Sequence, residues 1–265
     1  MWYQVAFKNY LASVDADAPP LPTKASLLNF VVQQRDRGVR PVTCNTYIGA
    51  MNAFCRWLHE EHHLAEPLKL KKLRVEQRVL SLLNDTQLRR LFTFKPKTFR
   101  QHRTHLAVYL VLDTGLRVSE MLTLRRDDLD FDNLILKVFG KGRKERLVPF
   151  STELRKRLFR FDQLRAKKGI RGECVFDGFE GSRWEKRNAT TSLYLLQDKL
   201  GLPRFGWHRL RHTFATNYLR YGGDIVRLSM VLGHTQITTT QRYLHLLTED
   251  LSASHQKVSI LSRLG

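Results

Sequence analysis

Apolar residues recur every three or four positions along most of the chain, which predicts a protein built mainly from helices. In the first 75 residues this spacing predicts three helices. The first covers 1–13, the second runs from an N-cap at Thr23 to about Arg37, and the third opens at Thr43 and reaches the run 59–63. The segment 15–22, rich in Pro and Asp, separates the first two helices. Residues 1–75 are therefore predicted to form a small all-α domain.

The remaining residues, 76–265, predict a larger and mainly helical domain. Helical spacing is found at 85–93 after an Asn84 cap, at about 99–112, after the turn at Gly115, and at 152–168, 188–200, 207–220, 224–232 and 237–247. Residues 134–139 and 145–149 instead flank a Gly-Lys-Gly-Arg-Lys turn, which predicts an antiparallel hairpin with a basic tip. The fold class is therefore α+β, mostly helical, with one small antiparallel sheet in the second domain.

The net charge restricts the possible functions of the chain more than the rest of its composition does. The chain has 45 Lys and Arg against 25 Asp and Glu, a net charge of +20, which favours a polyanion or an acidic membrane surface as partner. No apolar run is long enough to span a bilayer, and the N-terminus has no signal-peptide pattern. Cys44, Cys55 and Cys174 have no metal-type spacing and are expected to be reduced core thiols in a cytoplasmic protein.

A strip of basic residues joins the two predicted domains. It covers residues 67–80 and includes Lys69, Lys71, Lys72 and Arg74. One interpretation is a solvated linker. The other is a basic strap that follows a phosphate backbone between two domains, and the flanking domains favour it.

Two segments resemble metal-binding sequence motifs. His59 to His63 matches the H-E-x-x-H pattern of zinc proteases, but it falls at a charged helix end beside Pro67. The acidic run from Asp127 to Asp132 lacks the glycine and the final glutamate of a calcium loop. Neither segment is interpreted as a metal site, and no metal is expected.

The strongest chemical signal lies near the C-terminus. His208 and Arg211 share one face of a predicted helix, Gly233 ends the next helix just before His234, and Tyr243 follows nine residues later. Arginine suits phosphate, histidine moves protons near neutral pH, and a tyrosine hydroxyl can act as a covalent nucleophile. In a chain this basic, the group suggests transfer of a nucleic-acid phosphoryl group to Tyr243. A lone histidine such as His212 is more often a packed or solvated residue and is left out of the site.

These motifs resemble the tyrosine recombinases, also called the phage-integrase or Xer-like family. The matching segments are DTGLRVSE with Arg117 and Glu120, GKGRKERLVPF with Lys141, WHRLRHTFAT with His208 and Arg211, and LGHTQITTTQRY with His234 and Tyr243. The resemblance is specific over about 81–247, whereas residues 1–75 show only a helical, SAM-like core-binding pattern. The brief first helix departs from the longer N-terminal arm usual in the family.

The resemblance implies a residue set and a reaction. Tyr243 would attack a DNA phosphodiester to form a 3′-phosphotyrosine, with no metal or nucleotide cofactor. His208 would be the base and Lys141 the donor to the leaving 5′ oxygen. Arg117, Arg211 and His234 would hold the phosphate, and Glu120 would orient its neighbours. Arg143 and Lys144 of the hairpin tip, with the basic strip, would contact DNA.

The expected partner is double-stranded DNA with inverted-repeat sites. Apolar residues after Tyr243 suggest a C-terminal tail exchanged between the subunits of a homotetramer on two paired sites. The protein is expected in the cytoplasm at the nucleoid, with no membrane. Two alternatives remain open: a type IB topoisomerase with the same intermediate, and a DNA-binding protein without catalysis.

Overall fold

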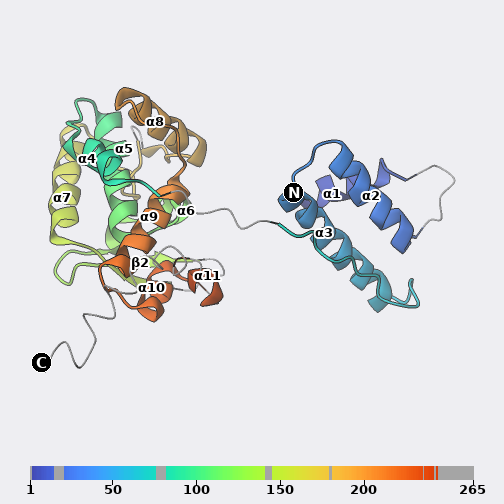
Figure 1. Ribbon diagram of the computed structural model, residues 1–265. Helices are drawn as coiled ribbons and strands as arrows, with labels where there is room; N and C mark the ends of the chain where they lie inside the picture. The colour runs from blue at the N-terminus through green and yellow to red at the C-terminus, as the bar shows by residue number, and fades with distance from the viewer. Residues whose placement is uncertain are drawn as a thin grey trace, which may run out of the picture. The chain divides into compact units, whose positions relative to one another are not determined.

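The computed structural model describes residues 2–14, 21–75, 82–140, 145–178, 181–234, 236–241 and 243. The chain divides into two compact units, residues 1–79 and 80–265. Each unit is described by itself. The described residues are mostly helical, with one three-stranded antiparallel sheet in the second unit (Figure 1).

The described residues of unit 1 form three helices, α1 (Trp2–Leu11), α2 (Lys24–Asp36) and α3 (Pro41–Glu60). Thr23 caps α2 as predicted, since its hydroxyl accepts the Ser26 amide in a capping box. The predicted start of α3 at Thr43 is wrong by two residues. The helix begins at Pro41, where the fixed φ of proline suits the first helical position and its missing N–H is not needed.

The core of unit 1 lies where the three helices meet. It includes Leu27, Phe30, Ile48, Met51 and Leu70. Leu70 belongs to the basic strip. This part of the strip, residues 67–75, therefore packs on unit 1 instead of running free as a linker.

Unit 2 is organised around one buried helix. Helix α4 (Asp85–Thr93), capped by Asn84 as predicted, precedes α5 (Phe99–Thr114), which packs against α6 (Val118–Thr123), α7 (Thr152–Lys167), α8 (Lys186–Lys199) and α9 (Trp207–Arg220). Helix α5 extends two residues beyond the predicted end. It stops at Gly115, which takes the left-handed conformation with φ of 66°. This cap turns the chain toward Arg117.

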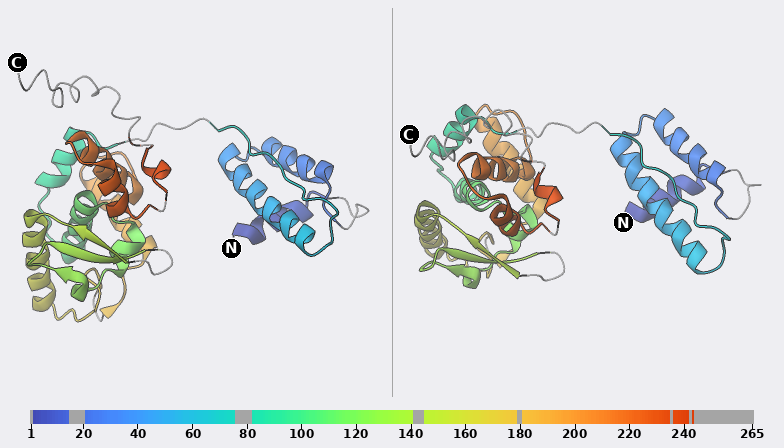
Figure 2. Two further views of the ribbon diagram at one scale, coloured as in Figure 1. Left: turned by 90° about the horizontal axis from the view of Figure 1, so that it is seen from below. Right: turned by 60° about the horizontal axis from the view of Figure 1, so that its bottom comes forward.

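The sheet of unit 2 has the order β1-β2-β3 (Figure 2). The predicted hairpin is confirmed as β2 (Ile135–Phe139) and β3 (Glu145–Pro149), with Phe139 paired to Glu145 beside the tip. A two-residue strand β1 (Leu129–Asp130), after the short 3-10 helix η1 (Arg126–Asp128), was not predicted. Asp130 accepts the backbone N–H groups of Asp132 and Asn133, so this carboxylate stabilises a turn.

The chain then reaches the motifs near the C-terminus. Helix α9 occupies the predicted residues, α10 (Ile225–Leu232) ends at Gly233 with φ of 64°, and α11 (Thr238–Gln241) is a single turn before Tyr243. The rest of the helix predicted over 237–247 lies outside the described residues, except Tyr243, which is in a turn.

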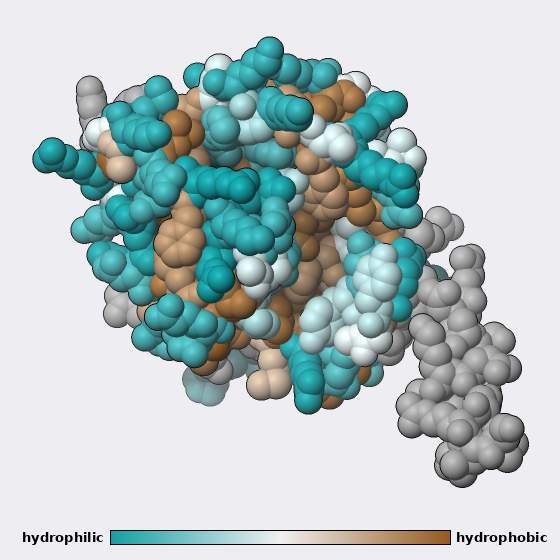
Figure 3. Space-filling model, turned by 90° about the vertical axis from the view of Figure 1, so that its left-hand side faces the viewer, coloured by the Kyte–Doolittle hydropathy of each residue, from teal (hydrophilic) through white to brown (hydrophobic). Residues whose placement is uncertain are grey.

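The surfaces and interior agree with a folded, charged protein. The face seen in Figure 3 is mainly hydrophilic, with apolar side chains visible in the hollows between polar ones. The three cysteines are free and buried, and burial raises the pKa of each thiol. Across the described ranges, no helix has the length and apolarity needed to cross a bilayer.

Candidate active site

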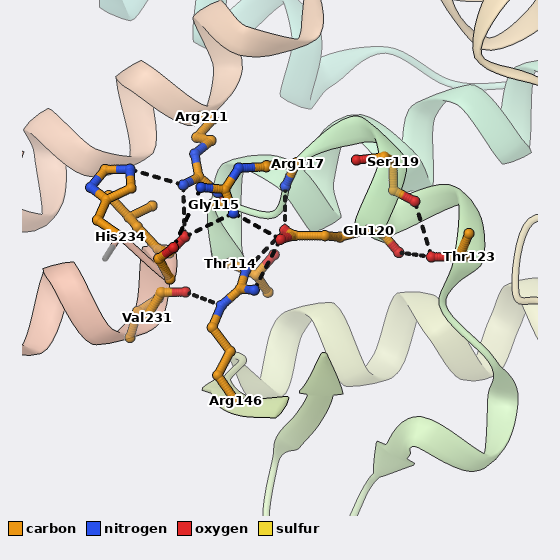
Figure 4. Close-up of polar contacts among 12 residues, drawn as sticks. Thr114, Gly115, Arg117, Ser119, Glu120, Thr123, Arg146, Arg211, Val231 and His234 are labelled. Atoms are coloured by element: carbon orange, nitrogen blue, oxygen red, sulfur yellow. Dashed lines mark hydrogen bonds and ion pairs between the residues drawn. The ribbon is translucent and has the colours of Figure 1, made fainter. Parts of the chain in front are cut away.

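A buried carboxylate joins two arginines at the start of α6. Glu120 accepts hydrogen bonds from the backbone N–H of Arg117 at 2.8 Å and from Arg117 Nη1 at 2.9 Å. Arg146, on β3, donates from Nη1 at 2.9 Å and from Nη2 at 2.8 Å (Figure 4). Burial alone raises the pKa of Glu120, but the hydrogen bonds and charges of Arg146 and Arg117 outweigh burial and hold this pKa below its ordinary value. Glu120 is therefore an anion at neutral pH.

Arg146 is the residue whose place the sequence did not reveal. Its side chain is 12% exposed and forms the bidentate pair with Glu120. Its Nε also donates to the carbonyl oxygen of Val231 at 2.7 Å. Arg146 thereby links β3, α6 and α10, and it fixes the carboxylate that orients Arg117.

Arg211 projects from α9 into the same region. Its Nη1 donates to the carbonyl of Gly115 at 2.6 Å and its Nη2 to the carbonyl of Leu232 at 2.8 Å. Arg117 Nη1 reaches the same Leu232 carbonyl at 3.4 Å, so the two guanidinium groups meet at one oxygen (Figure 4). Burial and the adjacent Arg117 lower the pKa of Arg211 to about 10, which leaves it charged at neutral pH.

His234 completes this cluster and is held from both ring nitrogens. Arg211 Nη2 lies 3.1 Å from Nε2, and Thr240 Oγ1 lies 2.8 Å from Nδ1. Because a guanidinium can only donate, Nε2 accepts here. The geometry therefore assigns a neutral ring with its proton on Nδ1, which donates to the buried hydroxyl of Thr240.

His208 lies on α9 one turn before Arg211 and is solvent-exposed. Desolvation by its surroundings, together with the positive charges of Arg211, Lys186 and Arg117, lowers the pKa of His208. The ring is therefore neutral at pH 7 and can accept a proton.

Tyr243 is 2% exposed and belongs to a small apolar cluster with Ala215, Leu219 and Leu228. A hydrogen bond of 2.9 Å joins its hydroxyl to Nδ1 of His212, the residue that sequence reasoning set aside. The signal that could have found His212 was its position four residues after His208, which puts both rings on one stripe of α9. Their centroids are 6.4 Å apart.

The structure thus gathers Arg117, Glu120, Arg211 and His234 in one network and places His208 and Tyr243 on its margins. Three predicted residues, Lys141, Arg143 and Lys144, lie outside the described residues. The cations at 69, 71, 72 and 74 belong to unit 1 and are exposed. In the described part of the chain, no three His, Cys, Asp or Glu side chains are grouped as metal ligands would be.

Comparison with known proteins gives the family. Residues 81–250, well over half of the chain, match the Phage integrase family. The chain belongs to the phage integrase family. Tyrosine recombinase XerA of Thermococcus kodakarensis is 31% identical to this family member over 246 residues, which are 90% of the chain and 83% of the relative. Tyrosine recombinase XerD of Lacticaseibacillus casei is 30% identical, over 96% of the chain and 90% of the relative.

Solved structures show the same fold. The XerH site-specific recombinase, bound to its palindromic difH substrate in a post-cleavage complex, superposes with a TM-score of 0.78 at 19% identity, over 96% of the chain and 77% of XerH. As a phage integrase family member, the chain is a site-specific tyrosine recombinase, an enzyme that transfers DNA strands.

Proposed function

We propose that Tyr243 is the nucleophile of this recombinase and that the phosphate it attacks is held by Arg117, Arg211 and His234. The observation that carries the proposal is the meeting of two guanidinium groups at the Leu232 carbonyl. Two cations this close repel each other, and this repulsion is one of the causes of the lowered pKa of Arg211. A phosphodiester bound between them offsets the repulsion and gains bidentate hydrogen bonds.

The reaction needs one proton acceptor and one donor. His208 takes the phenolic proton, the Tyr243 oxygen forms a bond to phosphorus, and the bond to the 5′ oxygen breaks. Lys141 gives that oxygen its proton, leaving a 3′-phosphotyrosine and a free 5′-hydroxyl. Attack by the 5′-hydroxyl of a partner strand reverses these steps and restores a phosphodiester, so the proposed cycle uses no cofactor.

The described conformation is a resting one. Tyr243 is 2% exposed as a residue and a duplex phosphodiester cannot enter its apolar cluster, so Tyr243 must leave this cluster and its hydrogen bond to His212 before it attacks. The pKa of Arg211 is lowered overall by burial and by Arg117, and the negative charge of an ionised Tyr243 would counter part of that lowering, because phenolate and guanidinium attract each other. Arg211 can therefore favour loss of the phenolic proton.

His234 also changes state in this proposal. Its Nε2 accepts from Arg211 in the free protein and so cannot donate to a phosphate. Protonation at Nε2 when the anionic phosphate binds would provide that donor, while Nδ1 keeps its bond to Thr240. The bound phosphate then has a hydrogen bond that the free enzyme lacks.

The wider assembly extends the same proposal. Unit 1 acts as a core-binding clamp on the duplex, with the cations at 69–74 on phosphates, and the hairpin tip adds Arg143 and Lys144. Inverted repeats would place two subunits on each site and a homotetramer on two sites, at the nucleoid. Deleting residues 248–265 should abolish pairing of sites but not cleavage; unchanged pairing on gel mobility assays would reject tail exchange.

A nicked suicide substrate tests the chemistry, because loss of a short 5′ fragment traps the covalent complex. The parent chain should give a covalent DNA–protein band on denaturing gels, and Tyr243→Phe should give none. The matched control is Tyr221→Phe, since Tyr221 is 83% exposed at the end of α9. A covalent band from Tyr243→Phe would overturn the assignment. A topoisomerase-like activity would appear as relaxation of supercoiled DNA that lacks paired sites.

A further inference from the structure

Residues 67–75, here called the basic strap, combine leucines that pack on unit 1 with exposed cations. Leu70 is 5% exposed within the core of unit 1, and Leu68 and Leu73 pack against the same core. The residues between them face solvent: Lys69, Lys71, Lys72 and Arg74. The leucines therefore fix the strap on unit 1 and leave its cations outward.

Two asparagines of α3 hold the backbone of the strap. Asn52 donates from Nδ2 to the Leu70 carbonyl at 2.9 Å and accepts the Leu70 amide at 2.8 Å. Asn45 donates to the Leu73 carbonyl at 2.9 Å and accepts the Leu73 amide at 2.7 Å. Each side-chain amide thus satisfies both backbone groups of one residue, as a neighbouring β-strand would.

The spacing of these pairs shows that the strap is extended. Asn45 and Asn52 are two helical turns apart, about 10.5 Å along α3. Leu70 and Leu73 are three residues apart, about 10 Å in extended backbone. The lengths match, so a straight strap runs antiparallel to α3 between the two asparagines.

Fixing the strap in this way has a purpose beyond the fold of unit 1. Its four cations are displayed together, and within the described ranges no carboxylate lies within ion-pair distance of any of them. A row of cations on ordered backbone is matched by a polyanion of regular spacing, and it binds without the entropy loss of ordering a free segment.

We propose that the basic strap is a preformed surface for the phosphate backbone of duplex DNA, and that Asn45 and Asn52 are the positioning residues that keep it ready. This inference rests on the proposed role of the strap cations in DNA binding. The asparagines do not touch DNA in this proposal; they act through the strap backbone.

The test measures binding of the full chain to a 30-base-pair duplex of mixed sequence across a range of salt concentrations. Replacing all four strap cations by alanine should reduce the salt slope by about 3 to 4, since each phosphate contact contributes about 0.9. An Asn45→Ala/Asn52→Ala double variant should keep the slope, because its cations remain, but bind about tenfold more weakly because the strap must now be ordered. Asn29→Ala, an exposed asparagine of α2, is the matched control and should bind as the parent does.

Hydrogen exchange supplies a readout that does not depend on DNA binding. The amides of Leu70 and Leu73 should exchange slowly in the free parent protein and rapidly in the double variant, while the α3 amides stay protected in both. Rapid exchange of those two amides in the parent would overturn the inference. An unchanged slope in the cation variant would reject contact between strap and DNA. Parent-like affinity in the asparagine variant, with a reduced slope in the cation variant, would reject only the positioning role.

Discussion

Glu120 provides a sharp test of how the candidate site is held together. Its side chain is 5% exposed and it accepts four hydrogen bonds, two from Arg117 and two from Arg146. Glu120→Gln keeps the shape of the side chain but removes its charge. The new amide N–H groups then face the N–H donors of Arg117 and Arg146, with which they cannot form hydrogen bonds. The Arg146 side chain, 12% exposed, is then left without its counterion.

The expected cost follows from that geometry. Breaking a buried pair by removing one partner costs about 3 to 5 kcal/mol, a large share of the roughly 5 to 15 kcal/mol that stabilises a typical domain. Arg146→Met should cost a similar amount, because Glu120 then keeps only Arg117. In the double variant neither buried charge remains, and Arg117 is 35% exposed and hydrated. The loss in free energy of unfolding of the double variant should therefore be about 2 kcal/mol smaller than the sum of the losses of the two single variants.

Urea unfolding of the full chain measures these values. Tryptophan fluorescence follows unit 2 through Trp184 and Trp207, which are 4% and 5% exposed. Glu173→Gln is the matched control, since Glu173 pairs with Arg125 at an exposed position and should change the free energy of unfolding by under about 1 kcal/mol.

The pH dependence gives a second measure of the same contact. The folded pKa of Glu120 is below its unfolded value, so its stabilisation is fully present above the unfolded value of about 4.3 and is lost as pH falls through the folded pKa. The difference between parent and Glu120→Gln should therefore shrink in strong acid. Strict additivity of the single effects, or a loss for Glu120→Gln no larger than that of the control, would refute the account.

Three further predictions concern the rest of the site. Gly115→Ala should destabilise unit 2 by more than about 2 kcal/mol, because the new Cβ would lie 2.4 Å from a Phe214 ring carbon and the φ of +66° is strained for alanine. It should also reduce cleavage, since the change would displace the Gly115 carbonyl that accepts from Arg211. A melting temperature equal to that of the parent would contradict this. Arg211 keeps Nε2 of His234 an acceptor, so nitrogen NMR of the parent protein should show the Nδ1-protonated tautomer, and Thr240→Val, which removes only the partner of Nδ1, should keep it; an Nε2-protonated neutral ring in the parent would rule out the assigned tautomer. The lowered pKa of His208 leaves its neutral form available below pH 6.5, so the acidic limb of the cleavage rate should lie below that value; a limb above pH 6.5 would exclude His208 as the base.

Local signals in the sequence were sufficient for most of the secondary structure. The caps at Thr23 and Asn84, the stop at Gly233 and the hairpin between 135 and 149 follow from short-range rules, because a cap or turn depends on residues three or four positions away. Two differences between the predicted and the observed elements are also local. Helix α3 starts two residues before the predicted Thr43 because Pro41 suits the first helical position, and β1 is too short to show a period.

The sequence also indicated the family, because it has recognisable motifs around Arg117, His208 and Tyr243, the residues proposed to react. What it did not contain is the set of partners. Arg146 pairs with Glu120 across 26 positions, and Tyr243 meets His212 across 31. Asn45 reaches the backbone of Leu73 across 28.

Only the tertiary structure decided those pairings. The alternation in a strand or the period of a helix tells which side a residue faces, but not which residue of another element lies opposite. That depends on how α6, β3, α9 and α10 pack around α5, and packing is fixed by the fit of the whole core. The sequence by itself therefore indicated the family and the side chains proposed to react, and the fold decided which of these side chains bind one another.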